Sequence, residues 1–205
     1  KTPTERNDKL CKIITKIASF PENLPVSEYE NWIKNSFIAS LQALQCDRVT
    51  GVLLHNEAAL PWLYVLQDLQ TQGLMDFYGA SLDSAKTADI DVLPAAQVPG
   101  NILDRRFDNY AERAKAAGAF VFMRSVYLQG LLLKEEKELA DTFKKTFLPT
   151  RRKLENLAKE AGISAAELYF RYALNNKNYT SILSGVETAQ QLQENIKIAE
   201  AGPLS

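Results

Sequence analysis

The run Arg48-Val-Thr-Gly-Val-Leu-Leu-His55 decides the fold, because it has the pattern of a buried strand that stops on the chain's single histidine. A second run, Leu10-Cys-Lys-Ile-Ile-Thr-Lys16, ends on a lysine in the same way. In parallel α/β sheets and barrels, the side chains that do chemistry lie at the carboxyl ends of the strands. The two runs therefore predict a parallel sheet with Lys16 and His55 near each other at its carboxyl-end mouth.

The composition is that of an ordinary globular protein, with 205 residues, 46% hydrophobic, 24% charged and a formal net charge of −1. The sequence has no basic tract, so its charge does not predict a nucleic-acid or membrane-surface partner. No apolar run approaches the roughly 18 residues of a membrane-spanning helix, and no signal peptide opens the chain. Cys11 and Cys46 lack metal-ligand spacing and predict reduced thiols in a cytoplasmic protein without a metal site.

Strand and helix patterns alternate along the chain without a linker, which predicts a single domain over residues 1–205. The predicted strands cover residues 12–16, 48–55, 75–79, 92–98, 119–123 and 181–184. Capping boxes at Ser27–Glu30 and Ser164–Glu167 open two of the predicted helices. The other predicted helices cover residues 58–70, 105–117, 135–147, 150–161 and 188–199, and Gly73, Gly118 and Gly162 each end a helix.

Six strands that each lead into helical sequence predict parallel β/α units with right-handed crossovers. A barrel built from such units needs eight of them. The expected fold is therefore an α/β (β/α)8 TIM barrel, of which this chain supplies about the last six units, with the first two units upstream of Lys1.

The chain resembles the aldo-keto reductase family over nearly its whole length, on motifs that follow the family's order. Ile14-Thr-Lys16 resembles the third barrel strand with its catalytic lysine, and Leu53-Leu-His55 resembles the fourth strand with its catalytic histidine. Stretches similar to the fifth to eighth strands and their loops are Gly79-Ala-Ser81, Gln97-Val-Pro-Gly-Asn101 with Leu103-Asp-Arg-Arg106, Ser125-Val-Tyr-Leu-Gln-Gly130-Leu-Leu, and Gly185-Val-Glu-Thr-Ala-Gln-Gln191-Leu-Gln-Glu-Asn195.

The resemblance implies a nicotinamide-dependent enzyme that reduces an aldehyde or ketone, including sugar-type carbonyls, by hydride transfer. In this family a tyrosine protonates the carbonyl oxygen, and a neighbouring ammonium lowers the pKa of that phenol from its usual value near 10. The resemblance assigns the ammonium to Lys16 and the hydrogen bond to the carbonyl oxygen to His55. The family's aspartate and tyrosine are not found in this sequence, where Thr2–Asp8 holds no tyrosine, so no turnover is expected from the chain as it stands.

The resemblance also implies that the chain binds NADP or NAD. Ser81 and Gln97 match residues that bind the nicotinamide carboxamide, while Leu82 replaces a usual asparagine and loses one contact. Arg124 stands where an aromatic ring usually stacks on the nicotinamide, a place that a guanidinium can also take. The pyrophosphate loop is matched by Ser125, Gln129, Gly130 and Leu131, and the adenine side by Gly185, Gln191 and Asn195.

Glu187 stands where many members of the family have a basic residue for the 2′-phosphate of NADP. A carboxylate at that position would repel the phosphate, which argues against the usual preference for NADP and leaves NAD open. Leu82 and Glu187 also leave open a second interpretation, in which the protein is a non-catalytic reductase-like subunit that binds a nucleotide or regulates a partner. Other enzymes on the same fold are a third alternative, because the barrel hosts many kinds of chemistry. The expected partner is a small-molecule carbonyl substrate, and the sequence gives no signal for the oligomeric state.

Overall fold

The computed structural model of the protein describes residues 12–202 and residue 204. Cys11 and Asp8, on which the sequence analysis commented, lie outside these residues. The chain divides into two compact units. The first unit comprises Glu112–Val121 and the described residues up to Val98, and the second unit comprises Pro99–Ala111 and the described residues from Phe122 onward.

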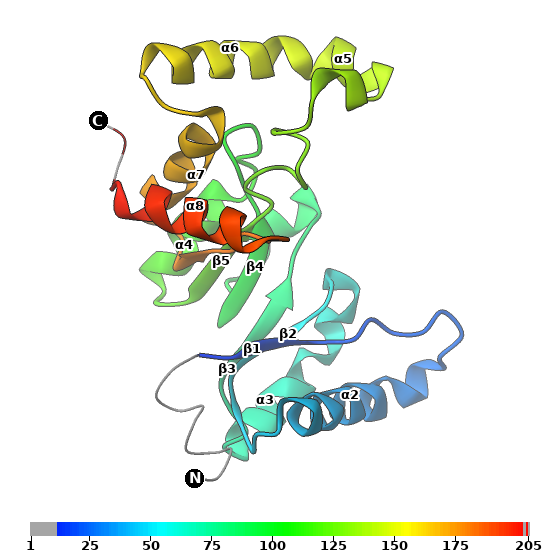
Figure 1. The fold of residues 1–205 in the computed structure, drawn as a ribbon. Helices are drawn as coiled ribbons and strands as arrows, with labels where there is room; N and C mark the ends of the chain where they lie inside the picture. The colour runs from blue at the N-terminus through cyan, green and yellow to red at the C-terminus, as the bar shows by residue number, and fades with distance from the viewer. Residues whose placement is uncertain (1–11, 203, 205) are drawn as a thin grey trace. The chain divides into compact units, whose positions relative to one another are not determined.

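The first unit begins with two β/α repeats, which are followed by a third strand and a 3-10 helix (Figure 1). Its elements are β1 (Ile14–Ile17), η1 (Val26–Glu28), α2 (Tyr29–Leu44), β2 (Val49–Leu54), η2 (Glu57–Trp62), α3 (Leu63–Thr71), β3 (Met75–Ser81), η3 (Ala85–Asp89) and most of β4 (Ala95–Pro99). Strand β1 pairs in parallel with β2, β2 with β3, and β3 with β4. Helices α2 and α3 pack against the strands through buried side chains such as Phe37 and Leu66.

The second unit holds most of the remaining elements. They are η4 (Glu136–Glu138), α5 (Asp141–Thr146), α6 (Leu148–Glu160), α7 (Ala165–Asn175), β6 (Ser181–Ile182) and α8 (Ala189–Glu200), while α4 (Asp108–Ala116) and β5 (Phe120–Arg124) are each divided between the units. Strands β5 and β6 pair in parallel, with Phe122 opposite Ser181. Leu132, Ala158, Leu168 and Tyr169 form a buried cluster that joins the segment after β5 to α6 and α7.

The six strands form one sheet in chain order, from β1 to β6, and each pairing whose register is known is parallel. This confirms the predicted parallel α/β class. Within residues 12–202, no helix has both the length and the apolar character needed to cross a membrane.

Several predicted element boundaries are wrong for local reasons. The helix predicted for 58–70 begins as the 3-10 helix η2, which contains Pro61, a residue that cannot donate the hydrogen bond of an α-helical interior. The helix predicted for 135–147 is broken where Leu139 and Ala140 adopt extended backbone conformations, and Leu139 is buried there. Strand β4 starts at Ala95, after Pro94, instead of at residue 92.

One predicted helix start is wrong and one is confirmed. Ser27 does not cap α2, because it lies inside η1, and α2 begins after Glu28 without a capping side chain. Ser164 does cap α7, where its hydroxyl accepts a hydrogen bond from the backbone N–H of Glu167. The three predicted helix-ending glycines all have positive φ angles, at 80° for Gly73, 75° for Gly118 and 71° for Gly162.

Candidate functional site

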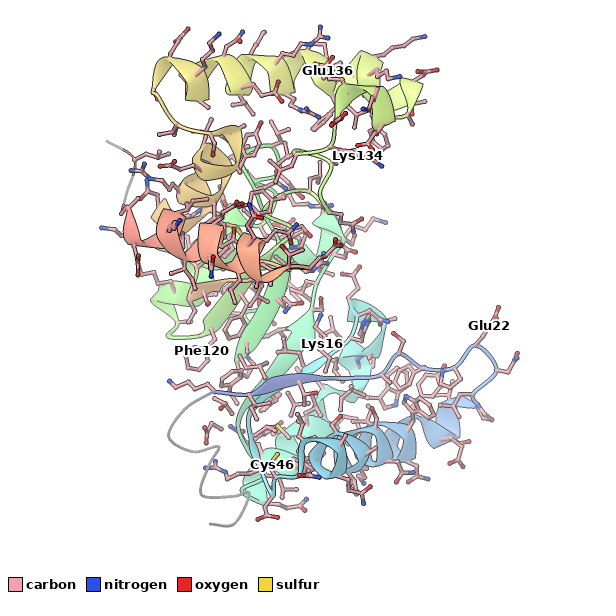
Figure 2. The ribbon with its side chains drawn as sticks, viewed as in Figure 1. Lys16, Glu22, Cys46, Phe120, Lys134 and Glu136 are labelled. Atoms are coloured by element: carbon pink, nitrogen blue, oxygen red, sulfur yellow. The ribbon has the colours of Figure 1, made fainter. Side chains whose placement is uncertain are left out.

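Strands β1 and β2 carry Lys16 and His55 to one face and one end of the sheet. In the parallel register Lys16 lies opposite Leu53, and His55 follows Leu53 by two residues. Because side chains alternate between the two faces of a strand, His55 shares the face of Leu53 and therefore of Lys16. Lys16, labelled in Figure 2, is half-buried and His55 is exposed, so a ligand can reach the histidine.

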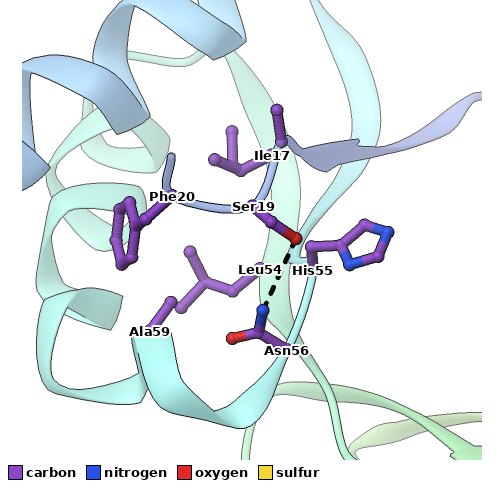
Figure 3. Close-up of a pocket in the computed structure, with 8 residues that line it drawn as sticks. Ile17, Ser19, Phe20, Leu54, His55, Asn56 and Ala59 are labelled. Carbon is purple, nitrogen blue, oxygen red and sulfur yellow. Dashed lines mark hydrogen bonds between the residues drawn. The ribbon is translucent and has the colours of Figure 1, made fainter. Parts of the chain in front are cut away.

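The residues after His55 hold the strand end in place. The Asn56 side chain accepts a hydrogen bond from the backbone N–H of Ala58 at 3.1 Å and so caps η2, and its amide donates to the Ser19 hydroxyl at 3.5 Å. Figure 3 shows the imidazole of His55 turned away from Leu54 and Ala59. The cavity that these residues line is only about 10 Å³, the volume of a single water, so it is no substrate pocket.

Ser81 and Gln97 extend this face across β3 and β4. Leu53 lies opposite Gly79, so Ser81, two residues further on, shares the face of Lys16 and His55. Ser81 lies opposite Gln97, and the pairing is held by a 2.9 Å hydrogen bond from the Leu82 N–H to the Gln97 carbonyl. The carboxyl ends of four consecutive strands therefore carry a lysine, a histidine, a serine and a glutamine on one face.

The Ser81 and Gln97 side chains are suited to bind an amide. They are 5% and 9% exposed, and their polar atoms are not among the fully buried side-chain atoms that lack a partner, of which the described residues have one, the Tyr169 hydroxyl. A ligand that carries both a donor and an acceptor can therefore take the place of water on these two side chains. Leu82 is fully buried, and its apolar side chain offers no hydrogen bond to such a ligand.

In the second unit, the loop after β5 has a backbone suited to bind an anion. Ser125, Leu128, Gln129 and Gly130 all have positive φ angles, from 50° to 84°. The loop is closed by hydrogen bonds from the Leu128 N–H to the Ser125 carbonyl at 2.8 Å and from the Leu131 N–H to the Leu128 carbonyl at 3.1 Å. Within residues 12–202, the N–H groups of Gln129 and Gly130 donate no hydrogen bond, and both residues are exposed. Successive N–H groups in such a turn form an anion-binding concavity.

This loop lines a cavity of about 980 Å³ that lies wholly within the second unit. The volume falls at the upper end of the range for ligand sites. Seven of the residues predicted from the sequence line it together, namely Ser125, Gln129, Gly130, Gly185, Glu187, Gln191 and Asn195. Arg124 and Leu131 are not among the residues that line it; the Arg124 guanidinium donates to the Ser125 hydroxyl at 3.3 Å, beside the loop.

The start of α8 forms the acidic wall of this cavity. The backbone N–H of Glu187 donates to the Gln191 side-chain oxygen at 2.7 Å, while the Thr188 hydroxyl caps the helix by accepting from the Gln191 N–H. Glu187, Glu194 and Glu138 line the cavity against a single ammonium group, that of Lys134. The charge around the cavity therefore disfavours additional negative charge on a ligand.

The sequence analysis missed two residues of this cavity, Tyr127 and Ser184, whose side chains form hydrogen bonds with Asn195. The Tyr127 hydroxyl donates to the Asn195 side-chain oxygen at 3.2 Å, and the Asn195 amide donates to the Ser184 hydroxyl at 3.2 Å. Tyr127 and Asn195 are 68 residues apart in the chain, and no local pattern predicts a contact over that separation.

Each unit by itself has groups that fit one part of a nicotinamide dinucleotide. In the first unit, the polar side chains of Ser81 and Gln97 suit a carboxamide. In the second unit, the N–H groups of Gln129 and Gly130 suit a phosphate. A Cβ added to Gly130 or Gly185 would meet no atom within 4 Å, so both glycines leave open space at the cavity for a ligand.

The sequence profile of the Aldo/keto reductase family matches residues 4–205, and the chain belongs to this family. The chain is similar in structure to the aldo-keto reductase AKR11C1 from Bacillus halodurans in its holo form, with 21% identity, a TM-score of 0.73 and coverage of 95% of this chain and 69% of that one. It is also similar to the glycerol dehydrogenase AKR11B4 from Gluconobacter oxydans, with 16% identity, a TM-score of 0.66 and coverage of 98% and 76%. No curated protein sequence matches the chain.

Family membership confirms the predicted resemblance and, with the parallel sheet, the (β/α)8 type of fold. The family consists of carbonyl oxidoreductases that use NAD(P)H. At 21% and 16% identity, the two solved structures support the fold alone.

Proposed function

We propose that the protein reduces an aldehyde or ketone, including sugar-type carbonyls, with NADH in the cytoplasm. The observation that carries this proposal is the common face on which the register of β1 to β4 places Lys16, His55, Ser81 and Gln97. A substrate carbonyl group and a carboxamide both accept hydrogen bonds through their oxygen atoms. This face offers hydrogen-bond donors to both groups at the carboxyl ends of the strands, where barrel enzymes have their active sites.

The proposed residue roles follow from the chemistry of each side chain. The bound nicotinamide supplies the hydride. Ser81 and Gln97 hold the carboxamide, and His55 donates a hydrogen bond to the carbonyl oxygen of the substrate, which stabilises the negative charge that develops there. The Lys16 ammonium lowers the pKa of the acid that protonates this oxygen. The family resemblance assigns that acid to a tyrosine on the unit before the lysine strand, and the first tyrosine of this sequence is Tyr29.

Substitution of the two catalytic candidates tests the proposal. In the full-length protein, Lys16→Met and His55→Ala should each lower kcat by about 100-fold or more while the Kd for NADH changes by less than about threefold. Lys12→Met is the matched control, because Lys12 lies two residues before β1, at the amino-terminal side of the strand, and is exposed. A variant with unchanged kcat removes that residue from the mechanism.

The cavity of the second unit supports NAD as the cofactor. Its loop N–H groups would bind the pyrophosphate, and Glu187, Gln191 and Asn195, which line the same cavity, would bind on the adenine side. The carboxylates around the cavity disfavour a 2′-phosphate more strongly than they disfavour a 2′-hydroxyl. At about 4 Å in a solvated site, one like-charge contact costs about 1 kcal/mol, roughly fivefold in affinity.

Glu187→Arg tests the choice of cofactor. It should raise the affinity for NADPH relative to NADH by about fivefold or more, because it replaces a repulsive charge with an attractive one. Glu200→Arg is the charge-matched control, because Glu200 is the last residue of α8, whereas Glu187 lies just before the start of that helix. Fluorescence titration of both cofactors measures the ratio, and an unchanged ratio in Glu187→Arg means that another residue contacts the 2′ position.

A second candidate function is nucleotide binding without catalysis. The fully buried Leu82 favours it, because its side chain cannot replace the amide contact that the family usually makes to the carboxamide. A full-length protein that binds NADH but reduces no aldehyde or ketone would support this second function over the first.

A further inference from the structure

The hydrogen-bond chain Tyr127–Asn195–Ser184 joins the loop after β5 to α8 across the cavity of the second unit. The Tyr127 hydroxyl lies 3.2 Å from the Asn195 side-chain oxygen, and the Asn195 amide nitrogen lies 3.2 Å from the Ser184 hydroxyl. The Ser184 hydroxyl in turn donates to the Gly185 carbonyl at 3.5 Å. All four residues line the same cavity.

The direction of this chain fixes the orientation of the Asn195 amide. The Ser184 hydroxyl has one hydrogen, which it donates to the Gly185 carbonyl, so it accepts from Asn195 and the amide nitrogen must face it. The amide oxygen then faces Tyr127 and accepts from its hydroxyl. One N–H and one oxygen lone pair of the amide are left for a ligand.

Tyr127 is held firmly enough to impose this orientation. Its ring stacks on Phe170, with ring centroids 6.1 Å apart and an interplanar angle of 17°, and it packs beside the cluster around Leu132. Burial, with a smaller contribution from the Glu194 carboxylate, raises the pKa of Tyr127 to about 12. The phenol therefore keeps its proton at neutral pH and remains a donor.

We propose that Tyr127 is a positioning residue that holds the Asn195 amide in the one orientation that accepts adenine and rejects hypoxanthine. This inference rests on the proposed dinucleotide function. On its Watson–Crick edge, adenine offers an amino donor beside the N1 acceptor, which pairs with an amide oxygen and an amide N–H. Hypoxanthine reverses this pattern, with a carbonyl oxygen beside a protonated N1, so it would set acceptor against acceptor and donor against donor on an amide that Tyr127 and Ser184 hold in place.

The ratio of two dissociation constants tests this role. The probes are NADH and reduced nicotinamide hypoxanthine dinucleotide, titrated into the full-length protein and followed by fluorescence. Wild type should bind NADH at least about fivefold more tightly than the hypoxanthine form. Tyr127→Phe should bring this ratio close to one, because the released amide can rotate and present its N–H groups to the hypoxanthine oxygen.

Two further variants separate positioning from general packing. Tyr169→Phe is the matched control, because it removes the hydroxyl of a buried tyrosine that has no hydrogen-bond partner, and the ratio should stay at the wild-type value. Ser184→Ala removes the acceptor at the other end of the amide and should also lower the ratio.

The outcomes separate this inference from the function on which it rests. Wild type that binds neither dinucleotide overturns the proposed function and this inference with it. Wild type that binds NADH and the hypoxanthine form equally overturns this inference alone. A wild-type ratio that persists in both Tyr127→Phe and Ser184→Ala also overturns it, because the orientation of the Asn195 amide would then not depend on its hydrogen bonds to Tyr127 and Ser184.

Discussion

The substitution Gly79→Ala tests the close approach of β3 and β4 that brings Ser81 and Gln97 together. A Cβ on Gly79 would lie 1.7 Å from the Ala95 carbonyl oxygen and 2.5 Å from its carbon. Both atoms belong to the backbone of β4, so no side chain can rotate out of the way. To restore even a 3.0 Å contact, the two strands must separate locally by about 1.3 Å.

This separation has two costs. Overpacking of a well-packed interior costs about 1–3 kcal/mol. The strand pairing beside Gly79, where Ala80 lies opposite Ala96 and Ser81 opposite Gln97, is stretched as well, and each weakened hydrogen bond costs about 0.5–1.5 kcal/mol. We expect a loss of about 2–4 kcal/mol, which lowers the urea midpoint by roughly 1–2 M for a slope near 2 kcal/mol per M.

Urea unfolding followed by circular dichroism measures the stability, and NADH titration without urea measures the site. Ile33→Val is the control, since Ile33 is fully buried in α2, away from the β3–β4 pairing, and its truncation costs about 0.5–1.5 kcal/mol. Gly79→Ala should weaken NADH binding at least about fivefold, because it displaces the carboxamide residues, whereas Ile33→Val should not. A wild-type urea midpoint in Gly79→Ala would refute the close approach, and unchanged NADH affinity would refute the role of Ser81 and Gln97.

Three more predictions address the second unit. Gly185→Ala should leave stability unchanged, because its Cβ meets nothing within 4 Å, but should weaken dinucleotide binding if a ligand fills that space; equal affinity would place the ligand elsewhere. Burial raises the pKa of Tyr127 above its unfolded value near 10. The contribution of this raised pKa to the free energy of unfolding is therefore complete below pH 10 and is lost as the pH rises towards 12. In alkaline unfolding, Tyr127→Phe should lose less stability than wild type over this pH range. Arg151→Met should cost about 2 kcal/mol and speed tryptic cleavage after Lys134, because the buried Arg151 guanidinium donates to the Lys134 carbonyl at 2.6 Å. The control is Arg152→Met, since the Arg152 side chain is exposed, and equal cleavage of the two variants would contradict this role.

The sequence predicted strands, helix caps and helix ends correctly where a single local interaction determines them. The apolar run before His55 is strand β2, and Ser164 caps α7 as its capping box predicts. The helix ends at Gly73, Gly118 and Gly162 were also predicted, because a positive φ angle strongly favours glycine. The errors arose where competing local signals meet, as at Pro61, which turns the predicted start of a helix into a 3-10 segment.

The strand register could be known only from the tertiary structure. A shift of one residue moves every side chain of a strand to the other face, and no local pattern specifies how β1 aligns with β2 or β3 with β4. The sequence predicted that Lys16, His55, Ser81 and Gln97 stand near strand ends, but the alignment of four strands decided that they share a face. The same reason explains the Tyr127–Asn195 contact, because hydrogen bonds between segments 68 residues apart depend on how β5, α7 and α8 pack, and packing is a property of the folded chain as a whole.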